Sequence, residues 1–132
     1  LLVGQNDGFL QEGLLRFPDA DTYLFPYSPF YASREEDRIA IQKLVPRYDT
    51  IVFLLMNYNS RDLLSDLEDY ADRIIVISAL TPVYLSELLW VKTAIAVYGS
   101  SRDAYRAGIG ALAGDYQPGG RLPININYLT QL

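Results

Sequence analysis

The chain has 132 residues, 50% of them hydrophobic, a net charge of −5, and neither cysteine nor histidine. This length and apolar content suit one domain with a sizeable core. The missing cysteine and histidine exclude disulfides, the usual zinc sites, and Ser–His or Cys–His catalysis within the chain. The acidic balance, without a basic cluster, argues against nucleic acid and anionic lipid as partners. The longest apolar run, residues 51–56, is too short to cross a membrane.

Five segments carry the pattern of β-strands. Residues 51–56 and 74–77 are continuous apolar runs, which are typical of strands covered on both faces. The segment 22–27 contains Pro26, which cannot donate a backbone hydrogen bond and therefore favours the edge of a sheet. In chain order, we expect strands at residues 1–4, 22–27, 51–56, 74–77 and 94–98.

A helix is expected after each strand, because apolar residues at helical spacing follow a residue that can cap a helix. The first helix should end before Pro18, and the fourth, which starts at Pro82, should be short. Ser33 and Glu36 have the spacing of a capping box, which would open a helix that runs to about residue 45. The expected caps, in chain order, are Asp7, Ser33, Ser60, Thr81 and either Ser100 or Ser101.

Alternating strands and helices predict a parallel sheet with helices on both faces and right-handed crossovers. With the second strand at an edge, the expected strand order is 2-1-3-4-5, which is flavodoxin-like. We therefore predict an α/β three-layer sandwich with a mostly parallel five-stranded sheet, formed by residues 1–132 as a single domain. Because the chain starts without Met and inside a strand, we expect it to be excised from a longer protein.

Ligands of open α/β sheets usually bind at the carboxyl ends of the strands. Polar residues follow four of the expected strands there, at 5–7, 57–59, 78–81 and 99–101. They could contact a neighbouring domain or a ligand such as a sugar, or they could serve only as caps and turns. The candidate cleft or domain-docking residues are Asn6, Asp7, Asn57, Tyr58, Asn59 and Ser100.

Other chemistries of this architecture do not fit the residues at these positions. A phospho-receiver domain would need an Asp where Asn57 ends the third strand, and a Lys where Gly99 follows the fifth. A glycosidase would need two carboxyl groups roughly 5–9 Å apart, and only Asp7 and Asp103 lie near the strand ends. We therefore expect no catalytic residue and no metal ligand in this chain.

Small residues recur along the last expected helix. Gly108 and Gly110 lie well inside it rather than at a strand–helix turn, so they do not form a dinucleotide-binding fingerprint. Because a glycine within a helix costs on the order of 0.5–1 kcal/mol relative to Ala, a packing reason is expected. Close packing of this helix on its own sheet is the favoured interpretation, and a partner surface is the alternative.

The last third of the chain contains three distinctive sequence segments, which are AVYGSS at 96–101, AGIGALAGD at 107–115 and QPGGRLP at 117–123. This order of buried strand, small-residue helix and Gly-Pro turn resembles the end of the second domain of glycoside hydrolase family 3, especially its β-N-acetylglucosaminidase branch. The resemblance is specific over residues 94–123 and only architectural over 1–90.

The resemblance implies a preceding (β/α)8 barrel that carries the catalytic Asp nucleophile and, in this branch, a His–Asp pair. In the β-glucosidase branch the second domain supplies a Glu, but no loop here matches that motif, so no catalytic residue is carried over. The implied role is an accessory domain, inactive alone, that packs on the barrel of an enzyme acting on β-linked N-acetylglucosaminides without cofactor or metal. The alternatives are a free-standing small-ligand or carbohydrate-binding module and a purely structural domain.

Overall fold

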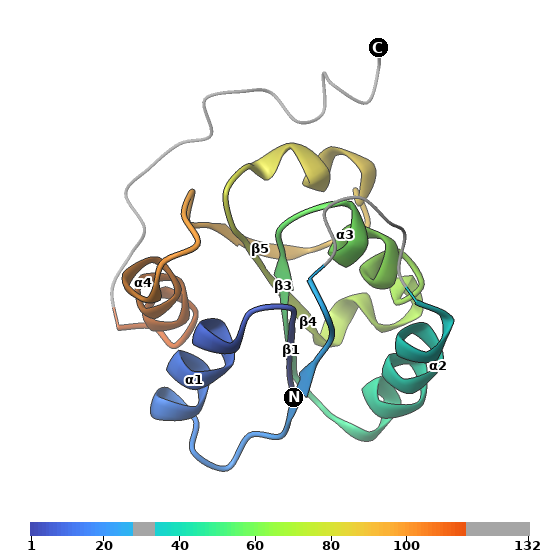
Figure 1. The fold of residues 1–132 in the computed structure, drawn as a ribbon, viewed down its shortest axis with the longest axis horizontal. Helices are drawn as coiled ribbons and strands as arrows, with labels where there is room; N and C mark the ends of the chain where they lie inside the picture. The colour runs from blue at the N-terminus through green and yellow to red at the C-terminus, as the bar shows by residue number, and fades with distance from the viewer. Residues whose placement is uncertain (28–33, 116–132) are drawn as a thin grey trace.

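The computed structural model describes residues 1–27 and 34–115 and contains a five-stranded, all-parallel sheet in the order β2-β1-β3-β4-β5 (Figure 1). The predicted α/β fold and the flavodoxin-like strand order are therefore confirmed. The strands are β1 (Leu2–Gly4), β2 (Thr22–Leu24), β3 (Ile51–Leu55), β4 (Ile74–Ser78) and β5 (Thr93–Ala96).

Helices cover both faces of the sheet, with α1 and α4 on one side and α2 and α3 on the other (Figure 1). The α-helices are α1 (Asp7–Arg16), α2 (Glu35–Leu44), α3 (Tyr58–Ser65) and α4 (Arg102–Leu112). Three short 3-10 helices complete the connections, namely η1 (Val45–Arg47), η2 (Glu68–Arg73) and η3 (Pro82–Glu87).

Alternating side chains of the central strands build a separate core on each face of the sheet. Along β3, Phe53 and Leu55 pack toward α2 and α3, whereas Val52 and Leu54 pack toward α1 and α4. Every residue of β3 is buried, which accounts for its continuous apolar sequence because helices cover both of its faces.

The two edge strands differ from their expected bounds. β2 ends at Leu24, before Pro26, and its side chains are more exposed than those of the central strands, so its predicted edge position is confirmed. β5 starts one residue earlier than expected and ends at Ala96 rather than residue 98. The reason is that Tyr98 has φ 59°, a left-handed backbone conformation that cannot continue a strand.

Two of the predicted helix caps are wrong by a few residues. The side chain of Asn6, rather than Asp7, caps α1, because Asn6 Oδ1 accepts a hydrogen bond from the backbone N–H of Phe9 at 3.2 Å. Likewise, α3 begins at Tyr58, and its cap is Asn57, three residues before Ser60. Ser60 N donates to Asn57 Oδ1 at 3.1 Å while Asn57 N donates to Ser60 Oγ at 3.0 Å, so the pair forms a reciprocal capping box.

The remaining caps and helices show a mixed outcome. Thr81 caps its helix as predicted, and Ser101 rather than Ser100 caps α4. The helix after Thr81 is a 3-10 helix, and the expected third helix is divided into α3 and η2. Ser33 lies outside the described residues, and Arg34 occupies the cap position of α2 without a side-chain cap hydrogen bond.

The glycine-containing face of α4 packs within the domain. A Cβ atom at Gly108 would lie 2.8 Å from Val97 Cγ1 and 3.5 Å from Ile77 Cδ1. Gly108 therefore allows α4 to approach the end of β4 and the segment that follows β5, and the favoured interpretation of intradomain packing is confirmed at this position.

Candidate functional site

The candidate site lies at the carboxyl edge of the sheet, where the chain reverses direction across the strand order. From β1 the chain crosses to β2 on one side and then returns to β3 on the other. The carboxyl ends of β1 and β3 therefore define the topological switch point, which is the usual ligand-binding position in this class of fold. The residues that immediately follow β1 and β3 include five of the six predicted site residues.

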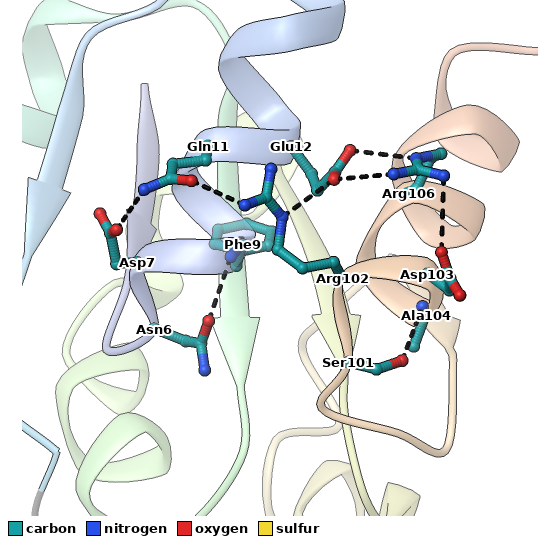
Figure 2. A network of polar contacts seen from close by, with 10 residues as sticks. All are labelled: Asn6, Asp7, Phe9, Gln11, Glu12, Ser101, Arg102, Asp103, Ala104 and Arg106. Carbon is teal, nitrogen blue, oxygen red and sulfur yellow. Dashed lines mark hydrogen bonds and ion pairs between the residues drawn. The ribbon is translucent and has the colours of Figure 1, made fainter.

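At the end of β1, the predicted residues Asn6 and Asp7 serve the start of α1. Asn6 Oδ1 caps the helix, and the exposed carboxylate of Asp7 accepts a hydrogen bond from the side-chain amide of Gln11 (Figure 2). The caps-and-turns interpretation describes these two side chains best. Ser100, the candidate after β5, is exposed and directly precedes the cap of α4.

At the end of β3, Asn57 and Asn59 make partial use of their amide groups. Asn57 Oδ1 caps α3, but its Nδ2 is buried and has no hydrogen-bond partner in the described part of the chain. Asn59 Nδ2 donates to the backbone carbonyl of Pro26 at 3.0 Å, but its Oδ1 is buried and no described residue pairs with it. Each of the two asparagines predicted from the sequence therefore has one unpaired polar side-chain atom.

Gln5 belongs to the polar segment 5–7 that the sequence predicted at the strand ends, but it was not among the six candidate residues. Its side chain is 6% exposed, and neither Nε2 nor Oε1 has a hydrogen-bond partner among the residues that the structure describes. Buried amide groups are normally paired, so a doubly unpaired glutamine is unusual. The only signal in the sequence is an amide side chain directly after a buried strand, and a glutamine that is exposed or capping would look the same.

Strand alternation places Gln5 on the α3 side of the sheet, which is the side on which Asn59 lies. Val3 packs on the α2–α3 face of the sheet and Gly4 faces Phe9 and Leu54 on the opposite side, so continued alternation directs Gln5 toward α3. Because β1 lies between β2 and β3, the hydrogen bond from Asn59 to Pro26 crosses the end of β1. We call Gln5, Asn57 and Asn59 the amide cluster.

Exposed apolar side chains surround this edge. Tyr58 is 56% exposed, packs edge-to-face on Tyr84 with ring centroids 5.5 Å apart, and lies beneath the Arg61 guanidinium at 4.7 Å. Leu80 and Tyr98, in the loops after β4 and β5, are exposed and have φ of 65° and 59°. We call the exposed apolar residues Tyr58, Leu80, Val83 and Tyr98 the apolar rim.

The left-handed backbone of Leu80 and Tyr98 is a strained conformation for large side chains. Both residues follow neighbouring strands of the sheet, and both expose apolar surface at its carboxyl edge. Such strain is typically maintained where the loop conformation serves a contact. The apolar rim therefore has two properties expected of a docking surface.

The carboxylates nearest the strand ends belong to a network that joins α1 to α4 (Figure 2). Asp7 binds Gln11, whose Oε1 accepts a hydrogen bond from Arg102 Nη1 at 2.7 Å. Asp103 accepts from Arg106 Nη1 at 3.4 Å. Both carboxylates therefore have structural partners on the helices.

No protein-family model matches the sequence, and neither a curated protein nor a solved structure is similar to it. Fold and site define the chain as an α/β domain of flavodoxin-like topology with an amide cluster and an apolar rim at the carboxyl edge of its sheet. No helix of the described ranges is long and apolar enough to cross a membrane. Within residues 1–27 and 34–115, no three acidic side chains gather as a metal site would require.

Proposed function

We propose that this chain is the α/β accessory domain of a family 3 glycoside hydrolase of the β-N-acetylglucosaminidase type. In this proposal the domain is inactive alone and packs through the carboxyl edge of its sheet on a catalytic (β/α)8 barrel of the same protein. The observation that carries the proposal is the apolar rim, where Leu80 and Tyr98 hold strained backbones while exposing apolar side chains.

The partners of the acidic side chains support a non-catalytic role. A retaining glycosidase uses two carboxyl groups about 5–5.5 Å apart across the bond to be cleaved. Asp7 and Asp103 are instead bonded to Gln11 and Arg106 in the network between α1 and α4. In the described part of the site, amide and aromatic side chains follow the strands.

The substrate class in this proposal comes from the family resemblance over residues 94–123. It comprises β-linked N-acetylglucosaminides, such as peptidoglycan fragments or chitooligosaccharides. An aromatic ring and amide groups at the carboxyl edge, from Tyr58 and Asn57, are side chains of the kinds that contact sugars, and they would wall one side of a cleft formed with the barrel.

The proposal is tested by comparing the isolated chain with a full-length parent that includes the barrel. We expect the parent, but not the isolated chain, to hydrolyse aryl β-N-acetylglucosaminide, and aryl β-glucoside serves as the substrate control. Turnover by the isolated chain would contradict the proposed inactivity, and Asp7 and Asp103 would be the first residues to mutate.

A matched pair of variants tests whether the domain docks on the barrel through the apolar rim. Tyr98→Glu in the parent should lower turnover by about tenfold, because a charge would be buried against the barrel. Leu15→Glu is the control, since Leu15 is also exposed but lies near the end of α1, away from the carboxyl edge. Equal activity of the two variants would show that the barrel docks elsewhere.

A further inference from the structure

Four buried polar atoms of the amide cluster have no hydrogen-bond partner within residues 1–27 and 34–115. They are Gln5 Nε2, Gln5 Oε1, Asn57 Nδ2 and Asn59 Oδ1. Gln5 and Asn59 are 6% and 5% exposed, so solvent does not satisfy these groups at the protein surface. Because an unpaired buried polar group destabilises a fold, such atoms call for a partner beyond the described residues.

The side chains of Asn57 and Asn59 are held in place because one polar atom of each amide already makes a hydrogen bond. Asn57 Oδ1 accepts from Ser60 N at 3.1 Å, which fixes the amide plane and leaves Nδ2 free. Asn59 Nδ2 donates to Pro26 O at 3.0 Å, which likewise leaves Oδ1 free. The free atoms of Asn57 and Asn59 are therefore preoriented, so little side-chain conformational entropy would be lost when a ligand binds.

The free atoms also form a balanced set of two N–H donors and two carbonyl acceptors. A charged ligand would lose its hydration in this buried position, and the neutral amides offer no opposite charge to compensate for that loss. A neutral group that both donates and accepts, such as the hydroxyl groups of a polyol or an amide, can pair with both kinds of atom.

We propose that Gln5, Asn57 and Asn59 bind a neutral ligand bearing hydroxyl or amide groups at the β1–β3 switch point. The site combines the usual ligand position of the fold with unpaired, preoriented amides of matching chemistry. This inference goes beyond the proposed function, because it concerns binding by the domain itself and holds whether or not the domain docks on a barrel.

The test uses the 132-residue chain labelled with ¹⁵N and follows the side-chain NH₂ signals of its asparagines and glutamines. D-glucose presents hydroxyl groups only, N-acetyl-D-glucosamine adds an amide, and sodium sulfate is the charged control. We expect saturable shifts of the Gln5, Asn57 and Asn59 signals with at least one sugar and none with sulfate. A response to both sugars identifies hydroxyl recognition, and a response to N-acetyl-D-glucosamine alone identifies amide recognition.

Gln5→Met provides the decisive variant, because methionine keeps the volume of glutamine and removes both unpaired atoms. It should weaken sugar binding by about tenfold, whereas its melting temperature should equal or exceed that of the wild type. Gln42→Met, on the exposed face of α2, is the control and should leave binding unchanged.

Three results would overturn the proposal. The first is the absence of saturable shifts with either sugar, which would leave water as the partner of the amides. The second is that sulfate causes shifts equal to those caused by the sugars. The third is that Gln5→Met binds the sugars as tightly as the wild type does. None of these results depends on the hydrolysis assay, so failure of this site and failure of the accessory-domain proposal are distinguishable.

Discussion

Glu12 on α1 accepts a bidentate pair of hydrogen bonds from Arg106 on α4, although 94 residues separate them (Figure 2). Arg106 Nε lies 3.2 Å from Oε2 of Glu12, and Arg106 Nη2 lies 3.1 Å from Oε1. Arg102 adds a third bond at 3.0 Å from its Nε to Glu12 Oε1. The Glu12 side chain is 2% exposed, so this carboxylate connects two helices that cover the same face of the sheet.

Glu12→Gln should destabilise the domain, because two arginines lose their shared carboxylate. The hydrogen bonds from Arg106 hold the pKa of Glu12 below its ordinary value, with a further contribution from Arg102 and an opposing effect of burial. A lowered folded-state pKa means that stability is present above the ordinary Glu pKa of about 4.3 and is lost as pH falls through the folded-state value.

Urea unfolding as a function of pH measures this effect. The stability difference between wild type and Glu12→Gln should be largest near neutral pH and should shrink at acid pH. Asp103→Asn is the matched control, because Asp103 is an exposed partner of Arg106 and such pairs contribute about 0–1 kcal/mol. A stability difference between wild type and Glu12→Gln that stays constant as the pH is lowered to about 2 would contradict the role assigned to the ionised Glu12 carboxylate.

Tyr23→Phe should lower the free energy of unfolding by about 1–2 kcal/mol, because the buried Asp37 loses one of its partners. Tyr23 OH donates to Asp37 Oδ1 at 2.8 Å, and Arg34 Nε donates to Asp37 Oδ2 at 2.8 Å. Chemical denaturation measures the loss. Tyr58→Phe is the control, since its side chain is exposed, and an equal loss in both variants would contradict the expectation.

The ionisation of Tyr23 gives an independent test at high pH. Burial, and then its hydrogen bond to Asp37, raises the pKa of Tyr23 from 10.0 to about 12. Because the folded-state pKa is raised, the stability contribution is fully present below pH 10.0 and is lost as pH rises toward about 12. In ¹³C NMR of the tyrosine Cζ atoms, Asp37→Asn should lower this pKa; an unchanged value would show that Asp37 has no part in the shift.

Asn57→Ala should destabilise the domain by about 1 kcal/mol, because it removes the acceptor that caps α3. Asn57→Asp keeps this acceptor and should retain most of the stability, since a negative charge at a helix N-terminus is favourable. Urea unfolding of the two variants separates the capping role of Asn57 from the role of its free Nδ2 atom. Equal destabilisation by both would contradict the capping role.

Gly108→Ala should destabilise the domain by about 1 kcal/mol, despite the better helix propensity of alanine. The added Cβ would lie 2.8 Å from Val97 Cγ1, and a β-branched valine has few other rotamers in which to relieve the contact. Val97→Ala should reverse part of the loss when combined with Gly108→Ala. Additive losses in this double-mutant cycle would show that the two residues are uncoupled.

Local patterns in the sequence were sufficient for the sheet. The apolar runs at 51–56 and 74–77 predicted the two central strands, and Pro26 predicted the edge strand, so the order 2-1-3-4-5 followed. These features depend on residues close together in the chain, through side-chain alternation, backbone donors and turn chemistry. For the same reason, the positions of helix caps were predicted only to within a few residues, since Asn57 and Ser60 can each occupy a cap.

The candidate site was only partly accessible from the sequence. Gln5 follows a buried strand just as Asn57, Tyr58 and Asn59 do. Its lack of a hydrogen-bond partner among the described residues could not be predicted, because pairing is a property of the surroundings of a side chain. Whether Gln5 is paired depends on segments that the fold brings to it, and the buried carboxylate of Glu12 depends on two arginines of α4. The positions and order of the strands therefore follow from local residue patterns, whereas the pairing of polar atoms follows only from the fold, because those contacts join segments far apart in the chain.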